Sequence, residues 1–412
     1  MKFTTVLTCL VLSLTVLTHA QSDEGFIYGK VTTKDNNEYI GQIRWEDEEA
    51  FWFDHFNSSK PYNQYVKYLP EEAKQRTQKE EITILDDWKI VINKKHFDGD
   101  FDHVFVCQFG DIKKIDVHHG DEVTLTFKNG FEYKLEGGSN DIGADINVMD
   151  PELGKVTLEW DRIEEVEFMK TPAELEKSMG QALYGTVFTE REGEYEGYIQ
   201  WDHDERISAD ILDGESRDGD FEIEFGNILS IEKLDDESCE VTLKSGRALT
   251  LGGTNDVDDG NRGVIINTPG FGRVDVDWDE FVRVEFDKSH SASGPRYDNY
   301  ITPERLSGSV VDQNDKLYAG LIVYDLDEIW DFEIIQGKRN DVEFLIPFRN
   351  IQSITPIFND VSRIKLRDGQ KLELEDSHDV SYDNYGIIVM QNEQGKDASY
   401  ISFRDVDEIE FK

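Results

Sequence analysis

Three short polar loops are the parts of this sequence best suited to bind an ion. They read Ser139-Asn140-Asp141, Thr254-Asn255-Asp256 and Ser377-His378-Asp379. Calcium takes several carboxylate, amide and carbonyl oxygens from a loop, so we consider a calcium or ligand site there. The candidate ligands are Asn140, Asp141, Asn255, Asp256, Asp258 and Asp379. The alternative is a turn in which the short side chain bonds its own backbone. No loop has the spacing of an EF-hand.

Tryptophans recur close to acidic residues and are a second set of candidate contacts. Trp45 and Trp201 each precede an acidic turn, and Trp278 lies in the stretch RVDVDWDEF. An aromatic ring beside carboxylates can stack on a sugar, so these three residues are candidates for a partner or glycan surface. They also lie on the apolar face of alternating stretches, which predicts that they fill a barrel core.

The sequence has no catalytic signature. There is no HExxH, no P-loop, no GxSxG and no CxxC pattern. Asp and Glu total 87 residues, so a pair of acids of the glycosidase type cannot be selected by spacing. We expect no enzymatic activity and no cofactor apart from the calcium considered above, while a hydrolase with an unrecognised carboxylate pair stays open as an alternative.

The N-terminus indicates export. Lys2 is followed by the apolar run TTVLTCLVLSLTVL and by Thr18-His19-Ala20, so residues 1–20 are predicted to be a signal peptide. We expect a secreted, periplasmic or envelope-associated protein without membrane insertion, because no second apolar stretch has spanning length. The net charge of −44 opposes binding to nucleic acid, which needs cationic patches. A protein or surface glycan is the expected partner.

Two cysteines remain after residue 20. Cys107 lies in the alternating stretch VFVCQFGDI, where Ile223 stands in a related phrase, and Cys239 precedes another alternating stretch. These positions are typical of small core residues, and they favour two buried thiols over one disulfide.

One phrase occurs three times, and it sets the architecture. It reads YGKVTTKDNNEYIGQIRWEDEE from Tyr28, YGTVFTEREGEYEGYIQWDHDE from Tyr184 and SGSVVDQNDKLYAGLIVYDLDE from Ser307. The pattern predicts a strand, a polar turn and a second strand with a glycine on its apolar face, where the strand bends or another backbone comes close. Each copy continues with a third strand and a closing phrase such as FEIEFGNILSIEKL (221–234).

A second phrase follows in each copy and resembles the first. It contains a hairpin with a turn at Asn129-Gly130, Ser245-Gly246 or Asp368-Gly369, and it ends in a strand such as RVDVDWDEFVRVEF (273–286). We therefore divide each copy into two consecutive halves, each a small barrel. The copies are predicted at 26–170, 183–288 and 304–412. The first carries an insertion at about 57–98.

The spacing of a turn, x-x-G-x-I-x-W-D, an acidic turn, a strand and then I-x-F-x-x-I-x-x-I resembles Sm-like and SH3-type small β-barrels. The whole phrase also resembles repeats of uncharacterised secreted bacterial proteins, and neither resemblance implies an activity for this chain. We expect an all-β fold of three tandem repeats, each a pair of such barrels. Short linker helices are predicted, including one that starts at Thr171-Pro172-Ala173-Glu174.

Triplication without catalytic residues favours a secreted or envelope-associated binding or scaffold protein, because linked weak sites gain avidity. Two alternatives remain. One is a calcium- or glycan-binding module that uses the Asn-Asp loops and the tryptophans, and the other is the hydrolase. The sequence does not define the oligomeric state.

Overall fold

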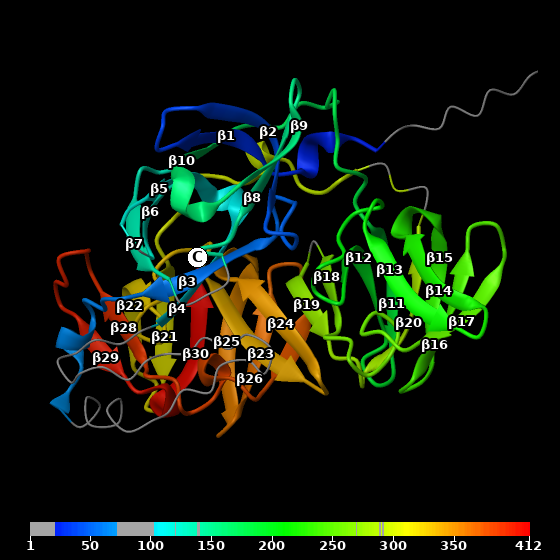
Figure 1. The fold of residues 1–412 in the computed structure, drawn as a ribbon. Coiled ribbons are helices and arrows are strands. Elements are labelled where there is room, and N and C mark those ends of the chain that lie inside the picture. Colours follow the sequence, from blue (N-terminus) through cyan, green and yellow to red (C-terminus); the bar gives the residue numbers. More distant parts are fainter. Residues whose placement is uncertain are drawn as a thin grey trace, which may run out of the picture.

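The computed structural model describes residues 21–71, 103–119, 121–137, 141–268, 270–287, 290 and 292–412. Within them the fold is all-β, as predicted, with three antiparallel sheets (Figure 1). The predicted signal peptide lies outside the described residues, as do Asn140 and residues 72–98 of the expected insertion. Residues up to Lys60 form strand β3, so the extra chain begins after Lys60 rather than at residue 57.

We call residues 26–170, 183–288 and 304–412 the first, second and third segments. The first contains β1 (Tyr28–Thr33), β2 (Glu38–Trp45), β3 (His55–Lys60), β4 (His103–Gln108), β5 (Ile112–Val117), β6 (Glu122–Phe127), β7 (Glu132–Glu136), β8 (Ile146–Asp150), β9 (Gly154–Leu158) and β10 (Ile163–Phe168). The second contains β11 (Tyr184–Thr189), β12 (Glu194–Trp201), β13 (Ile211–Ser216), β14 (Gly219–Glu224), β15 (Ile228–Asp235), β16 (Ser238–Leu243), β17 (Ala248–Gly252), β18 (Val264–Thr268), β19 (Gly272–Val276) and β20 (Phe281–Phe286). The third contains β21 (Ser307–Asp312), β22 (Leu317–Val323), β23 (Ile334–Arg339), β24 (Val342–Pro347), β25 (Ile351–Phe358), β26 (Val361–Leu366), β27 (Lys371–Leu374), β28 (Ile387–Met390), β29 (Ser399–Ile401) and β30 (Val406–Phe411).

Every other element with described bounds is a 3-10 helix of a single turn. These are η1 (Asp23–Gly25), η2 (Val66–Tyr68), η3 (Phe109–Asp111), η4 (Trp160–Arg162), η5 (Phe225–Asn227), η6 (Tyr297–Asn299), η7 (Phe348–Asn350), η8 (His378–Val380) and η9 (Phe403–Asp405).

The strand order differs from the predicted consecutive halves. The first sheet runs β4-β3-β7-β6-β5-β10-β1-β2-β8-β9, and the second follows the same order from β14 to β19. The first hairpin, β1–β2, therefore pairs with β10 and β8, while the middle strands β3 to β7 pair with one another and join the sheet through the β5–β10 pair. The halves have nearly the same alternation of residues, so the sequence pattern alone does not distinguish the two pairings.

The glycine in the second strand of each segment lies where another backbone comes close, which was one of the two predicted reasons for it. A Cβ atom added to Gly41 would collide with the carbonyl oxygen of Met149 on β8, and one added to Gly197 would collide with that of Asn267 on β18. Only glycine permits this approach. It allows the first hairpin to pack tightly against the strand that follows the Asn-Asp loop.

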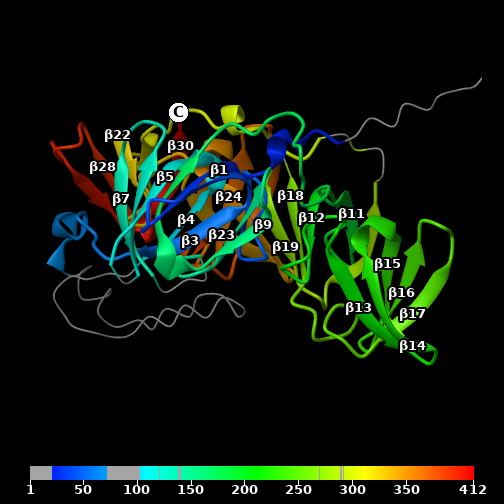
Figure 2. The ribbon, with the colours of Figure 1, turned by 45° about the horizontal axis from the view of Figure 1, so that its top comes forward.

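The second and third segments share one sheet. Strands β24 and β23 of the third segment continue the 12-stranded second sheet through β19, with Arg273 opposite Leu345 and Val274 opposite Phe344. In Figures 1 and 2 these strands lie between the second segment and the rest of the third. The same views show that β13–β17 project away from the other two segments.

Carboxylates with little or no exposed surface hold the segments together. Asp54, Asp210 and Glu333 occupy corresponding places, and each accepts two backbone N–H groups of its own turn. Each also pairs with a cation from another segment. The pairs are Asp54–Arg206, Asp210–Arg44 and Glu333–Lys60. Every carboxylate thus caps a turn and fixes an interface, which offsets the cost of burying its charge.

The stretch after β10 was predicted to start a helix at Thr171, and this prediction is wrong. Residues 171–183 form bends and extended chain. The Thr171 hydroxyl donates to the carbonyl of Phe26, and Asp23 bonds the backbone at Ala173 and Leu175. These groups are bonded to residues near the start of the described chain, so the capping pattern does not lead to a helical turn.

Both cysteines of the described chain are free and buried, as expected. Burial raises the pKa of the Cys239 thiol to about 12, so the thiolate is scarce at neutral pH.

Candidate functional site

The aspartates of the Asn-Asp loops make the same two contacts in every segment. Each carboxylate accepts a backbone N–H from the third strand of its segment. Each carbonyl oxygen accepts a hydrogen bond from the aromatic residue that ends or directly follows the second strand. The N–H donors to Asp141, Asp256 and Asp379 are Asn57, Asp213 and Gln336, at 2.5, 2.6 and 2.7 Å. The aromatic donors are Trp45, Trp201 and Tyr324, at 2.8, 2.9 and 2.5 Å. The loops therefore tie two strands together.

The three candidate tryptophans lie in the core. Trp45 and Trp201 have no exposed surface, and Trp278 is 4% exposed. Trp278 stacks on Phe281 with ring centroids 5.2 Å apart and meets Trp201 edge to face. None of them presents a face to a sugar or a partner in this structure.

Acidic side chains gather at the turn after the second strand. Asp202, Asp204 and Glu205 bring carboxylate oxygens within 4.8 Å of one another in the second segment, and Asp325, His378 and Asp379 form a similar group in the third. Asp204 Oδ1 and Glu205 Oε2 are buried and accept no hydrogen bond from any residue that the structure describes. Such groups can share a proton or take a divalent cation.

Burial raises the pKa of these carboxyl groups because it disfavours their charged form. The pKa of Glu205 rises to about 11 and that of Asp379 to about 8, with neighbouring carboxylates adding to the effect of burial. Burial also opposes the imidazolium of His378, but the Asp325 carboxylate at 2.7 Å outweighs it and raises the pKa of His378 to about 9. The turns therefore hold protons near neutral pH.

Only some of the predicted ligands join these groups. Asp379 belongs to the third-segment group, while Asn255 donates to Asp202 beside the second. Asp258 instead accepts the N–H of Gly260, and Asp256 is committed to the strand contacts above. The residues that sequence reasoning missed are Asp202, Asp204, Glu205, Asp325 and His378. The available signal for the four acids was their recurrence in the acidic turn after the repeated second strand, and that for His378 was its place beside Asp379 in the Ser377-His378-Asp379 loop.

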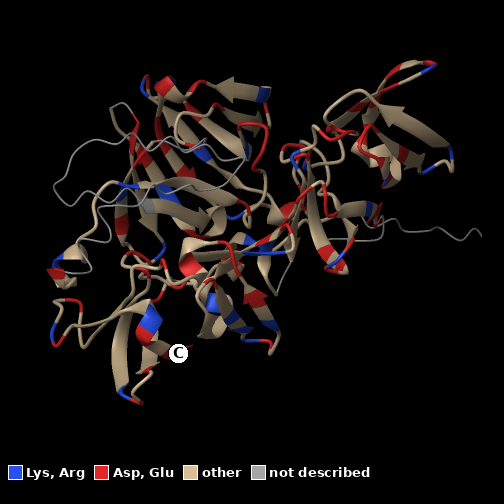
Figure 3. Ribbon diagram, turned by 90° about the horizontal axis from the view of Figure 1, so that it is seen from below, with Lys and Arg blue, Asp and Glu red and all other residues tan. Residues whose placement is uncertain are grey.

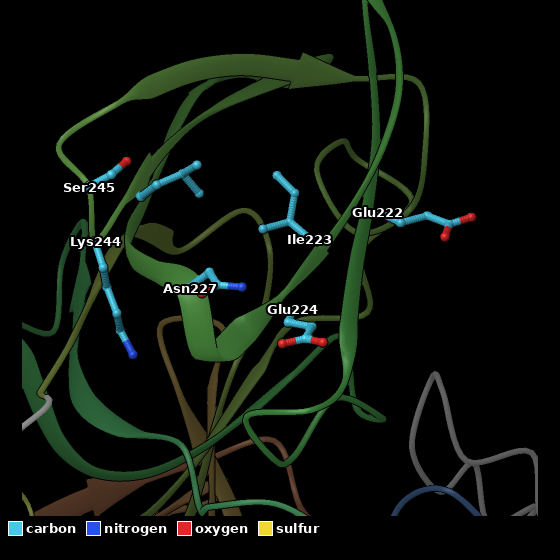
Figure 4. A pocket seen from close by; sticks show the side chains of 7 residues that line it. Glu222, Ile223, Glu224, Asn227, Lys244 and Ser245 are labelled. Carbon is cyan, nitrogen blue, oxygen red and sulfur yellow. The ribbon is translucent and has the colours of Figure 1, made fainter.

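A groove opens on the projecting end of the second segment. It has a volume of about 450 Å³. Its lining comes from β14, η5 and the turn after β16, and consists of Glu222, Ile223, Glu224, Asn227, Leu243, Lys244 and Ser245. Lys244 and Ser245 lie opposite Glu222 and Glu224 (Figure 4). We call this feature the β14 groove.

The corresponding surfaces of the other two segments are covered by the chain itself. In the first segment, Lys128 donates to the carbonyls of Tyr297 and Tyr300 at 2.7 and 2.9 Å, and Asn129 donates to that of Pro303. In the third segment, Asn350 donates to the carbonyl of Gly270 from the β18–β19 turn. Among the described residues, the counterpart in the second segment is open and forms the β14 groove.

Comparisons of the chain with protein-family models and with curated proteins, and of its fold with solved structures, found no match. None of the helices in the described part of the chain has the length and apolarity needed to cross a bilayer. Acidic residues are spread over all three segments rather than confined to one face (Figure 3). The β14 groove and the acidic turns are therefore the features of this chain that bear on its function.

Proposed function

We propose that this chain is a non-catalytic binding or scaffold protein that takes a protein segment into the β14 groove. The observation that carries the proposal is that the same surface holds a piece of chain in the first and third segments. A surface built twice to receive peptide is suited to receive it a third time, and β14 supplies an unpaired strand edge beside the groove.

The exposure of the β13–β14 hairpin supports this proposal. Every residue of β3 is buried, and most of β24 is buried, whereas β13 and β14 alternate between exposed and covered residues. Ile211 on β13 is 37% exposed, while its counterpart Ile334 on β23 is 8% exposed. The second segment thus leaves open a surface that its counterparts use for packing.

The finer architecture belongs to the same proposal. We take the segments as three copies of one module, each a pair of five-stranded Sm-like or SH3-type barrels, because the strand order is shared between sheets and the sequence phrases repeat. We place the protein outside the cytoplasm, secreted or attached to the envelope, on the strength of the apolar N-terminal run.

The test is site-specific photo-crosslinking in cells that produce the protein. The photoreactive amino acid p-benzoylphenylalanine replaces Ile223 in the groove, and Leu317, an exposed apolar residue of β22 at 63% exposure, is the control position. We expect peptide adducts at residue 223 and few at residue 317. Mass spectrometry then identifies the attached segment. Equal, background-level adducts at both positions would refute a binding role for the groove.

A further inference from the structure

We infer that the partner of the β14 groove is a second copy of this chain, which inserts its β8–β9 hairpin. This inference rests on the proposed function and names the partner of the same site. It is carried by a contact already present within the chain, in which the β18–β19 hairpin of the second segment docks on the third segment.

The β18–β19 hairpin shows how a hairpin fills this surface. Its edge strand β19 pairs with β24, and the turn places the carbonyl of Gly270 on Asn350. Phe271 at the tip packs against Phe344 of β24, with ring centroids 5.7 Å apart. Gly272 has φ +100°, and a Cβ there would press on Leu345 and Pro347. The edge strand, the turn and the residue at the tip therefore all contribute to the docking of this hairpin.

The β8–β9 hairpin has the same build, but none of the described strands pairs with the outer edge of β9. Its turn reads DPELG (150–154), against TPGFG (268–272) in the β18–β19 hairpin, and Gly154 shares the positive φ of Gly272 at +85°. Leu153 takes the place of Phe271 and is 66% exposed. Strand β9 is the last of its sheet. An apolar tip beside an open edge is what a docking hairpin requires.

The observed β19–β24 register, transferred to β9 and β14, brings complementary residues together. Arg273 faces Leu345 in the observed pair, and Val274 faces Phe344. At the same positions Lys155 faces Glu222, and Val156 faces Phe221. Lys155, Asp220, Glu222 and Glu224 form no ion pair with any residue that the structure describes, and all four are exposed. In a chain with net charge −44, an unpaired lysine opposite an acidic strand favours this pairing over others.

The turn itself is also complementary. A Cβ at Gly270 would lie 3.2 Å from the carboxylate of Asp368 and 3.5 Å from the amide of Gln370. The counterpart of Gly270 in the β8–β9 turn is Glu152, and the counterpart of Gln370 beside the β14 groove is Arg247. In the inferred contact, Glu152 and Arg247 take the places that Gly270 and Gln370 have in the observed one. The inferred contact therefore gains an ion pair at the edge of the groove.

The third hairpin, β28–β29, is a poorer candidate. Strand β29 has three residues, and its turn, which includes Gly395, lies against Tyr68 of the first segment. Its Tyr400 packs against the first-segment core. The observations therefore commit the β14 groove to the β8–β9 hairpin, either by mutual exchange in a closed dimer or in a chain of copies.

The experiment is sedimentation velocity of the full secreted chain over a range of concentrations. We expect reversible self-association that weakens about fivefold in Lys155→Glu and in Glu222→Lys, because a cross-strand charge pair contributes up to about 1 kcal/mol. The double variant K155E/E222K restores opposite charges across the contact and should recover the association. Leu153→Asp should abolish it, with Leu317→Asp as the matched control that associates normally. Circular dichroism verifies that each variant is folded.

Two results overturn the inference. One is a monomer at every concentration, and the other is association that none of the hairpin or β14 variants changes. The crosslinking at residue 223 separates this failure from that of the proposed function. Adducts to residues 150–158 of this chain support both. Adducts confined to another protein keep the groove as a binding site but exclude the second copy as its occupant.

Discussion

The Arg206–Asp54 pair gives the sharpest test of how the segments are held together. Arg206 is fully buried, and its guanidinium lies beside the stacked rings of Phe51 and Phe53, 5.1 and 5.0 Å from their centroids. It is the cation of Asp54, which also accepts the N–H groups of Ala50 and Phe51 at 2.8 Å. The perturbation is Arg206→Met, which keeps an apolar chain beside the rings and removes the charge.

The expected cost follows from what Arg206→Met leaves behind. Breaking a buried ion pair by removing one partner costs about 3–5 kcal/mol, because the remaining charge is uncompensated. The two backbone N–H groups still bond Asp54, so we expect the lower end, about 3 kcal/mol. Replacing both partners, as in Asp54→Asn with Arg206→Met, should cost less than Arg206→Met alone.

The assay is urea unfolding followed by tryptophan fluorescence. Arg162→Met, in an exposed pair with Asp35, is the control and should leave stability unchanged. If Arg206→Met is no more destabilising than Arg162→Met, or if the two replacements at the buried pair add without coupling, the pair does not hold the first and second segments together.

Three further predictions concern the Asn-Asp loops and the acidic turns. The pKa of Asp379 is raised from 3.8 to about 8, so its contribution to stability is present below about pH 4 and is lost as the pH rises towards 8. In Asp379→Asn the melting temperature should therefore fall less steeply over that range, and an unchanged slope would contradict this prediction. Asp256→Ala, which frees the N–H of the third strand, should lower the unfolding free energy by about 1 kcal/mol, whereas Asp258→Ala should not; both are measured by urea unfolding. If the acidic turn of the second segment binds calcium, adding calcium to chelator-treated protein raises the melting temperature. The double variant Asp204→Asn with Glu205→Gln should abolish this rise, and no rise in the unmodified chain excludes the site.

Much of the fold could be read from local patterns. Alternation of apolar and polar residues and the turn signals predicted the strands and the all-β class. Gly41 and its counterparts predicted either a bend or a close backbone, and the structure shows the second. The pairing of the first hairpin with β8 and β10, instead of with the middle strands that follow it, could not be predicted. Strands β8 and β3 both follow loops, so either could pair beside β2, and only the tertiary contact decides between them.

The candidate site, like the fold, could be predicted from the sequence only in part. The recurrence of Asp141, Asp256 and Asp379 showed that these positions matter, but a carboxylate that caps a strand and one that binds calcium have the same residue type. The difference lies in the donor, here a backbone N–H of the third strand, and no sequence pattern identifies that donor. The helix predicted from Thr171 failed for the same reason, because distant groups compete for its backbone.

The exposure of β14 can nevertheless be predicted from its residues. Its outward positions are Asp220, Glu222 and Glu224, whereas β24 has Leu345 and Pro347 at two of the matching places. Apolar residues on both faces indicate a strand covered on both sides, and strict alternation indicates one side in water. Charges on an edge strand also deter indiscriminate pairing. An acidic edge of this kind disfavours most strands of an acidic protein but accepts one that carries a lysine at the right register. Lys155 on β9 meets that condition, so the same charges that keep β14 from pairing at random select its partner.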